Sequence, residues 1–170
     1  PGERLALVLV WSADAPNRLG EVILVAPRGA PVEFGRGTQV LVRQRPEENR
    51  PTPPMGGRRL SRQQLRIQGM GARLQVENVG RCPMRVHDTV TPQAVLVPGD
   101  LLHLEGQLSF LVARRPALML ANRAAFLPPW GGADEGGIVG ESPAIWRLRD
   151  QIGFVAPRAG HVLILGRSGT

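Results

Sequence analysis

The chain has 170 residues, and 42% of them are hydrophobic, which is enough to bury one core with an appendage. No apolar run reaches the roughly 20 residues of a membrane-spanning helix, and the lone Cys82 excludes a disulfide framework. We therefore expect a cytoplasmic protein without a membrane partner.

The charge is strongly positive, +7 at neutral pH, and all 21 basic residues are arginines. A guanidinium group pairs readily with phosphate or carboxylate, so an acidic or phosphorylated partner is one explanation of this charge. The base composition of the genome is the other. Direct contact with DNA is not expected, because aromatic residues, on which bases stack, make up only 4% of the chain.

Residues 1–115 consist of short apolar runs separated by turn signals, a pattern typical of an all-β sandwich or barrel. Apolar and polar side chains alternate over Leu74–Glu77, as expected for a half-buried strand. Glu105-Gly106 predicts a tight hairpin, and Pro98–Asp100 predicts a turn. The candidate strands are Leu5–Trp11, Glu21–Ala26, Val32–Gly35, Gln39–Arg43, Leu65–Gly69, Leu74–Asn78, Met84–His87, Ala94–Val97, Leu101–Leu104 and Gln107–Ala113.

One long polar stretch, from Arg45 to Arg59, interrupts this pattern and contains four prolines. We predict a loop there, and a loop of that length in a compact domain is usually functional or disordered. His87 and Asp88 are expected in a surface turn. The 3 histidines and Cys82 lack the spacing of a metal site.

Residues 116–137 are predicted to form a linker, since Pro128–Gly137 combines a semi-rigid proline pair with flexible glycines. The helix that follows has the clearest signals in the chain. Ser142 is a good N-cap, Pro143 suits the first helical position, and Pro157 ends the helix. Its apolar residues share one face, namely Ile145, Leu148, Ile152 and Val155.

The last part of the chain predicts a buried strand at Val162–Leu165 and then a glycine-containing turn. A phosphate-binding P-loop has this order of strand and turn, completed by a Lys and a Ser or Thr on the next helix. The sequence printed here stops before such a Lys. We therefore expect the start of a nucleotide-binding domain from a longer protein, and no catalysis by this fragment.

Four short motifs follow one another in the first part of the chain: Phe34–Gly37, Leu60–Ile67, Val76–Gly80 and Val97–Leu104. In this order, over roughly residues 3–115, they resemble the forkhead-associated (FHA) domain. The resemblance implies a β-sandwich of about ten to eleven strands. It also implies that the loops at one end bind a phosphothreonine-containing protein.

The resemblance places a phosphate against Arg36 and Ser61, with Arg62 and Arg81 as further contacts. A phosphate dianion favours a bidentate guanidinium together with hydroxyl and N–H donors. The chain departs from the family at Gln64, where the family has a His that braces the loop. It departs again at Gly80–Met84, where the family's Asn-Gly, which grips the peptide, is absent. We expect a phosphate pocket in outline, with peptide selectivity altered or lost.

The matches in the last part are Gly140–Ser142, the helix, and Val162–Thr170 with its incomplete P-loop of Gly166, Arg167, Ser168, Gly169 and Thr170. They resemble the start of the AAA+ ATPase domain of bacterial sigma-54-dependent transcriptional activators, although Arg167 replaces the family's Glu. The resemblance implies ATP, Mg²⁺ and the sigma-54 RNA polymerase holoenzyme as ligands and partner of the parent protein, and no cofactor in this fragment. The front domain would then control the ATPase by sensing phosphorylation of a partner.

Three interpretations remain open. The chain is a phosphopeptide-binding regulatory module, or a degenerate FHA-like domain used as a phospho-independent interaction or dimerisation surface, or an inactive fragment of an ATPase. The helical face formed by Ile145, Leu148 and Ile152 is expected to pack against the β domain or against a second chain, and the latter would give an oligomer through the tail.

Overall fold

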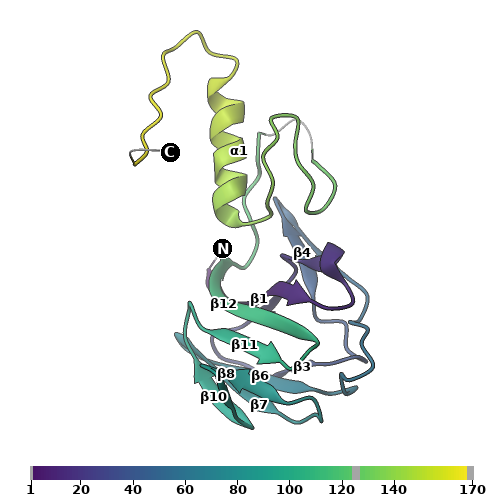
Figure 1. Cartoon of the computed structure of the whole chain (residues 1–170). Helices are drawn as coiled ribbons and strands as arrows, with labels where there is room; N and C mark the ends of the chain where they lie inside the picture. Colours follow the sequence, from purple (N-terminus) through teal and green to yellow (C-terminus); the bar gives the residue numbers. More distant parts are fainter. Residues whose placement is uncertain (1, 124–126, 168–170) are drawn as a thin grey trace.

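In the computed structural model, residues 2–123 and 127–167 are described, and they form two β-sheets packed face to face with one α-helix beside them (Figure 1). The predicted mainly β sandwich is confirmed. The larger sheet has the order β5-β4-β2-β1-β12-β11-β8-β9, and the smaller sheet has the order β10-β7-β6-β3. The elements are β1 (Glu3–Ser12), a 3-10 turn η1 (Pro16–Arg18), β2 (Val22–Val25), β3 (Val32–Phe34), β4 (Val42–Arg45), β5 (Glu48–Pro51), β6 (Leu65–Met70), β7 (Arg73–Asn78), β8 (Met84–Val86), β9 (Thr89–Val90), β10 (Gln93–Leu96), β11 (Leu101–Leu104), β12 (Leu108–Pro116) and α1 (Pro143–Val155).

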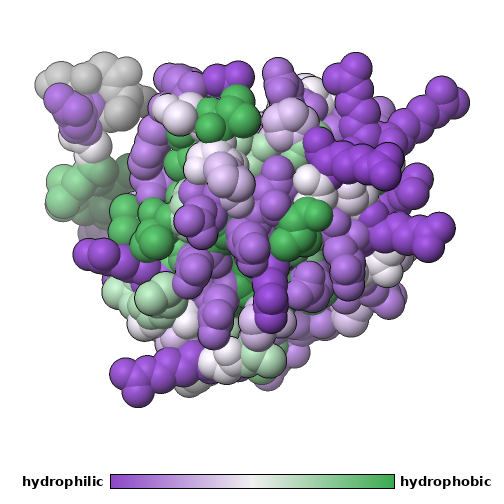
Figure 2. All heavy atoms as spheres, turned by 90° about the horizontal axis from the view of Figure 1, so that it is seen from below, coloured by the Kyte–Doolittle hydropathy of each residue, from purple (hydrophilic) through white to green (hydrophobic). Residues whose placement is uncertain are grey.

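The core lies between the two sheets and is built from side chains that alternate along the strands. Leu74 and Val76 of β7 are fully buried, whereas the residues between and after them face solvent. Phe34 and Phe110 meet edge to face across the sandwich, with ring centroids 5.2 Å apart. The surface seen from below is mostly hydrophilic, and long hydrophilic side chains project from its right-hand edge (Figure 2).

The β4–β5 hairpin corrects the prediction of one continuous loop over Arg45–Arg59. β5 pairs antiparallel with β4, and the turn between them places Glu47 at a φ of 59°. The side-chain amides of Gln44 and Asn49 each donate at 2.7 Å to backbone carbonyls, that of Gln44 to Pro116 at the end of β12 and that of Asn49 to Ala117, the next residue. Distant partners therefore hold a polar strand that its own sequence does not indicate. The neighbouring strand, predicted at Gln39–Arg43, begins only at Val42.

The predicted surface turn at His87 and Asp88 is confirmed, and it connects β8 to the short strand β9, which was not predicted. Both residues have positive φ, 47° and 61°, as in a type I′ turn, one of the two turn types that match the natural twist of a two-residue hairpin. The ring Nε2 of His87 lies 3.0 Å from Oδ1 of Asp100, which helps to hold this conformation.

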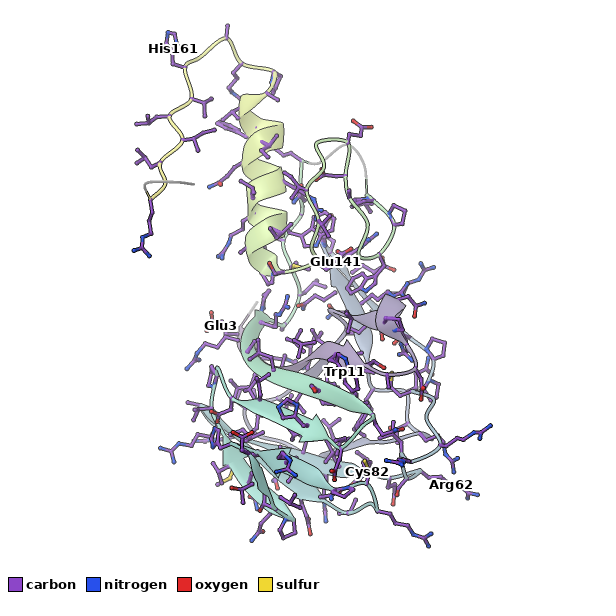
Figure 3. All side chains as sticks on the ribbon, viewed as in Figure 1. Glu3, Trp11, Arg62, Cys82, Glu141 and His161 are labelled. Carbon is purple, nitrogen blue, oxygen red and sulfur yellow. The ribbon has the colours of Figure 1, made fainter. Side chains whose placement is uncertain are left out.

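Residues 128–142, which we call the strap, lead to α1. They include the second half of the predicted linker, 116–137, and the residues between it and the helix. Glu141, labelled in Figure 3, joins the strap to its neighbours and is only 7% exposed. Its carboxylate accepts hydrogen bonds from Nη2 of Arg45 at 2.8 Å, from the N–H of Gly131 at 3.0 Å and from Nε1 of Trp146 at 3.1 Å. One buried carboxylate therefore connects strand β4, the strap and the helix.

Arg149 makes a second set of contacts at the same place and is only 4% exposed. Its Nε donates to Oδ2 of Asp134 at 2.8 Å, and its two other nitrogens donate to the carbonyls of Ile138 and Gly140, each at 2.8 Å. The guanidinium also lies 4.6 Å from the ring centroid of Trp146. The strap is thus closed into a loop against the helix by charge-assisted bonds.

The helix is formed as predicted, and Ser142 Oγ accepts the N–H of Ile145 at 3.2 Å. Its buried face is different from the predicted one. Trp146 is 2% exposed beside Arg149, whereas Leu148 and Ile152 are 41% and 42% exposed. Of the two predicted alternatives, packing of this face on the β domain is therefore not found, because the indole and guanidinium groups find hydrogen-bond acceptors in the strap that aliphatic side chains cannot use. Packing against a second chain stays a prediction.

The predicted strand at Val162–Leu165 is not formed. These residues follow α1 as an extended segment whose side chains are 61–89% exposed. A strand needs a partner for its N–H and C=O groups, and none of the described residues pairs with this segment. Among the helices of the described part, none has the length and apolar character to cross a bilayer.

Candidate functional site

Three loops meet at one end of the smaller sheet, which we call the loop end. The strand register places Phe34, Leu65 and Asn78 side by side, so β3 ends, β6 begins and β7 ends at the same edge. The segments 35–41, 52–64 and 79–83 therefore start or finish within two strand spacings of each other, with the 52–64 segment in the middle. In Figure 3, Arg62 and Cys82 mark this end at the lower right of the sandwich.

Gly35 allows the first two loops to touch. A Cβ at this position would lie 2.2 Å from the carbonyl oxygen of Arg62, so only glycine fits without moving the backbone. The contact is then sealed by two bonds: the N–H of Arg36 donates to Ser61 O at 2.9 Å, and the N–H of Gly37 donates to Arg62 O at 3.2 Å. Arg36, Ser61 and Arg62, all predicted as site residues, are thereby brought together.

Gln64 braces the loops from inside and is fully buried. Its Nε2 donates to Oδ1 of Asn78 at 2.6 Å and to the carbonyl of Cys82 at 2.9 Å, while its Oε1 accepts the N–H of Ser61 at 3.0 Å. A Cβ on Gly80 would meet this amide at 2.5 Å. The amide thus does the bracing expected of a His at this position in the family that the sequence resembles.

Asn78 belongs to the same network; it lies within the Val76–Gly80 motif but was not predicted as a site residue. Its Nδ2 donates to the carbonyl of Cys82 at 3.0 Å, which closes the 79–83 loop on itself. Burial raises the pKa of the Cys82 thiol, and the nearby Glu105 raises it further, so Cys82 stays protonated and serves as packing. The sequence signals for Asn78 are its place in the Val76–Gly80 motif and its position at the end of a clearly alternating strand.

The hydroxyl of Ser61 accepts the backbone N–H of Arg81 at 2.9 Å, which joins the second loop to the third. A serine hydroxyl has one proton to donate besides its acceptor sites, so this bond leaves the proton free for a ligand oxygen. Arg81 is therefore next to Ser61 through its main chain, with its side chain exposed.

The cations of this end lack carboxylate partners. In the part of the chain that the structure describes, Arg36, Arg62 and Arg81 form no ion pair, whereas arginines elsewhere pair with Glu21 or Glu141. The described residues also contain no group of His, Cys, Asp and Glu side chains able to hold a metal ion. The arrangement thus offers guanidinium, hydroxyl and N–H donors, a set suited to an anion.

Neither known family profiles nor curated proteins match this sequence. Among solved structures, it is similar to one described by its phosphothreonine-dependent FHA domain interactions, with 18% identity over 66% of this chain and 98% of that one and a TM-score of 0.47. It is also similar to the FHA domain of CT664 from Chlamydia trachomatis (18% identity, 65% of this chain and 96% of that one, TM-score 0.48). A third is the FhaA FHA domain complexed with the intracellular domain of Rv3910 (17% identity, 64% and 98%, TM-score 0.44).

These neighbours are FHA domains. Their identity to the chain is below one fifth, so they say nothing about the roles of individual side chains.

The described part of the predicted nucleotide-binding segment lies in the tail beyond α1, away from the loop end. Gly166 and Arg167 belong to the extended tail beyond α1, and Ser168, Gly169 and Thr170 lie outside the described residues. The tail is drawn above the sandwich in Figure 1, remote from the loop end. The structure therefore does not bring the two predicted sites together.

Proposed function

We propose that the loop end binds a phosphothreonine-containing peptide, with Arg36 and Ser61 as the main phosphate contacts and Arg62 and Arg81 as flanking cations. The observation that carries the proposal is the hydrogen bond from the N–H of Arg36 to the carbonyl of Ser61 at 2.9 Å. It joins a residue with a guanidinium to a residue with a free hydroxyl proton, on two loops that are far apart in sequence.

The chemistry favours binding over catalysis. Each charge-assisted hydrogen bond to a phosphate oxygen contributes about 1.5–3 kcal/mol. The brace through the buried Gln64 fixes the 52–64 and 79–83 loops before a ligand arrives, so little ordering entropy opposes binding. Selectivity for phosphate over an unmodified hydroxyl follows from the net positive charge of the loop end.

The test compares a phosphothreonine peptide with its unphosphorylated twin by isothermal titration calorimetry. Arg36→Ala should weaken binding of the phosphopeptide about 10- to 100-fold, which corresponds to the loss of one such bond. Ser61→Ala should weaken it about tenfold. Arg73→Ala is the matched control, because Arg73 begins β7 at the opposite end of the smaller sheet and is exposed.

Equal binding of the two peptides, or the same affinity in Arg36→Ala as in Arg73→Ala, contradicts the proposal. Such a result would favour a phospho-independent interaction surface instead.

We further propose that this module regulates a bacterial, cytoplasmic sigma-54-dependent activator whose AAA+ domain starts at residue 138. The support is the sequence resemblance together with the helix capped by Ser142. In a longer protein that continues past Thr170 with Gly-Lys, ATP and Mg²⁺ would bind at the completed P-loop, and the phosphopeptide should change the rate of ATP hydrolysis. An unchanged rate and an unchanged oligomeric state contradict this second proposal.

A further inference from the structure

The β4–β5 hairpin has two different faces, because side chains alternate along each of its strands. The side-chain amides on one face donate to the main chain at the end of β12, as described above. The other face carries Arg43 directly opposite Arg50, and Arg45 directly opposite Glu48. One side of this hairpin is therefore occupied by charged groups alone.

The charged face and the start of the strap border a hollow of about 390 Å³, which we call the strap hollow. This volume lies in the range of pockets that hold small molecules. In Figure 3, Glu141, to which Arg45 is bonded, lies at the base of α1, whereas Arg62 and Cys82 lie at the lower right of the sandwich. The strap hollow is thus separate from the loop end. Its lining consists of Arg43, Arg45, Glu48, Arg50, Leu127, Pro128, Pro129 and Trp130.

Trp130 forms an aromatic wall of the strap hollow. Its Nε1 donates to the carbonyl of Leu19 at 3.0 Å, which fixes the plane of the indole ring. The guanidinium carbons of Arg43 and Arg45 lie 5.3 Å and 5.5 Å from the ring centroid. Because the indole is only partly buried, a planar ligand can stack on it or on a guanidinium group beside it.

Arg43 and Arg50 are like charges directly opposite each other, an arrangement that destabilises a hairpin. Arg43 donates through Nε to Glu21 at 3.1 Å, and in the described part of the chain its two terminal nitrogens have no acceptor. The side chain of Arg50 forms no ion pair with any described carboxylate. A phosphate between the two guanidinium groups would accept hydrogen bonds from both and remove their repulsion.

Glu48 makes the strap hollow unsuited to a simple anion, because its carboxylate would repel one. Its cross-strand neighbour Arg45 is already bonded to Glu141 at 2.8 Å and to the carbonyl of Pro128 at 2.7 Å. Among the described residues Glu48 has no ion-pair partner. A ligand that fits the hollow must therefore offer a hydrogen-bond donor to Glu48 as well as an anion to the arginines.

We propose that the strap hollow binds a nucleotide whose base carries an amino group. The phosphate lies between Arg43 and Arg50, the base stacks beside Trp130, and the amino group donates to Glu48. Adenine, guanine and cytosine carry such a group, whereas uracil presents carbonyl oxygens that a carboxylate repels. This site does not depend on phosphopeptide binding at the loop end.

Isothermal titration calorimetry with adenosine monophosphate, adenosine and inorganic phosphate tests whether ring and phosphate act together. The nucleotide should bind roughly tenfold more tightly than either part, since it alone makes both sets of contacts. Cytidine monophosphate should bind about tenfold more tightly than uridine monophosphate, because only its base donates an amino group to Glu48.

Tryptophan emission locates the bound nucleotide. The chain has 3 tryptophans, of which Trp130 alone lines the strap hollow, and the three segments of the loop end contain none. The nucleotide should therefore change the emission of the wild-type protein, and Trp130→Phe should remove most of that change.

Substitutions in the hairpin separate the two contacts. Arg50→Gln should weaken nucleotide binding about tenfold and leave the affinity for the phosphothreonine peptide unchanged. Glu48→Gln should remove the difference between cytidine and uridine monophosphates, since an amide donates as well as accepts. Arg73→Gln and Glu47→Gln are the matched controls and should change neither result. All four side chains are exposed, so these substitutions leave the core intact.

Equal affinities for adenosine monophosphate and inorganic phosphate overturn the proposed nucleotide site. The same follows from nucleotide binding that is unchanged in Arg50→Gln, from equal binding of cytidine and uridine monophosphates, and from displacement of the nucleotide by the phosphothreonine peptide, which would place it at the loop end. Each of these results leaves the proposed phosphopeptide function standing.

Discussion

Replacing Glu141 by Ala should detach α1 from the sandwich while the sandwich stays folded. The carboxylate accepts hydrogen bonds from Arg45, Gly131 and Trp146, and its side chain is nearly buried. Its loss leaves the Arg45 guanidinium, 16% exposed, without a counter-ion. Removing one partner of a buried ion pair typically costs about 3–5 kcal/mol.

That cost has an upper limit, because the helix can leave the surface and let water solvate the orphaned groups. We therefore expect the free energy of docking to fall by about 3 kcal/mol, near the low end of that range. Denaturant titration followed by tryptophan fluorescence measures it. Trp146 is 2% exposed and should shift to the red on release, whereas Trp11 is already 47% exposed and should change little.

Glu135→Ala is the matched control, since Glu135 lies in the same strap but is exposed. It should change stability by less than about 0.5 kcal/mol. If Glu141→Ala gave the same emission spectrum and the same transition as this control, the carboxylate would not be what holds the helix.

Two further substitutions test the loops and the strap. Gln64→Ala removes the internal brace and should lower the free energy of unfolding by about 3 kcal/mol and weaken phosphopeptide binding, whereas the exposed neighbour variant Gln63→Ala should do neither; equal denaturation midpoints would refute the bracing role. The hydrogen bond from Arg149, and then that from the N–H of Ile138, lower the pKa of Asp134 from its ordinary value of 3.8. This contribution to docking is complete above about pH 4 and is lost as the pH falls through the lower folded pKa, so acid titration of tryptophan emission should be flatter in Asp134→Asn; coincident profiles would contradict it.

The elements that were predicted correctly from the sequence are those determined by residues close together in the chain. The alternation of β7 and the Ser142-Pro143 start of α1 depend on neighbouring residues, and both are found where expected. β5 has the sequence Glu-Asn-Arg-Pro, which carries no strand pattern, and it exists because β4 and distant carbonyls pair with it.

The same distinction applies to the candidate site. The order of motifs was enough to expect Arg36 and Ser61 at one end of a sandwich. The part played by Asn78 arises only where the loops meet, so no single stretch of sequence predicts it. The buried face of α1 was missed for a related reason, since its acceptors belong to the strap.

The strap has a consequence for whatever is attached beyond α1. A helix of 13 residues is a lever about 20 Å long. Because the contacts of Glu141 and Arg149 hold α1 against the strap, the helix has a fixed orientation relative to the sandwich, which a flexible linker would not give it. A domain attached to the far end of α1 would keep a fixed orientation relative to the sandwich. Weakening the contacts of Glu141 and Arg149 would leave that domain free to reorient.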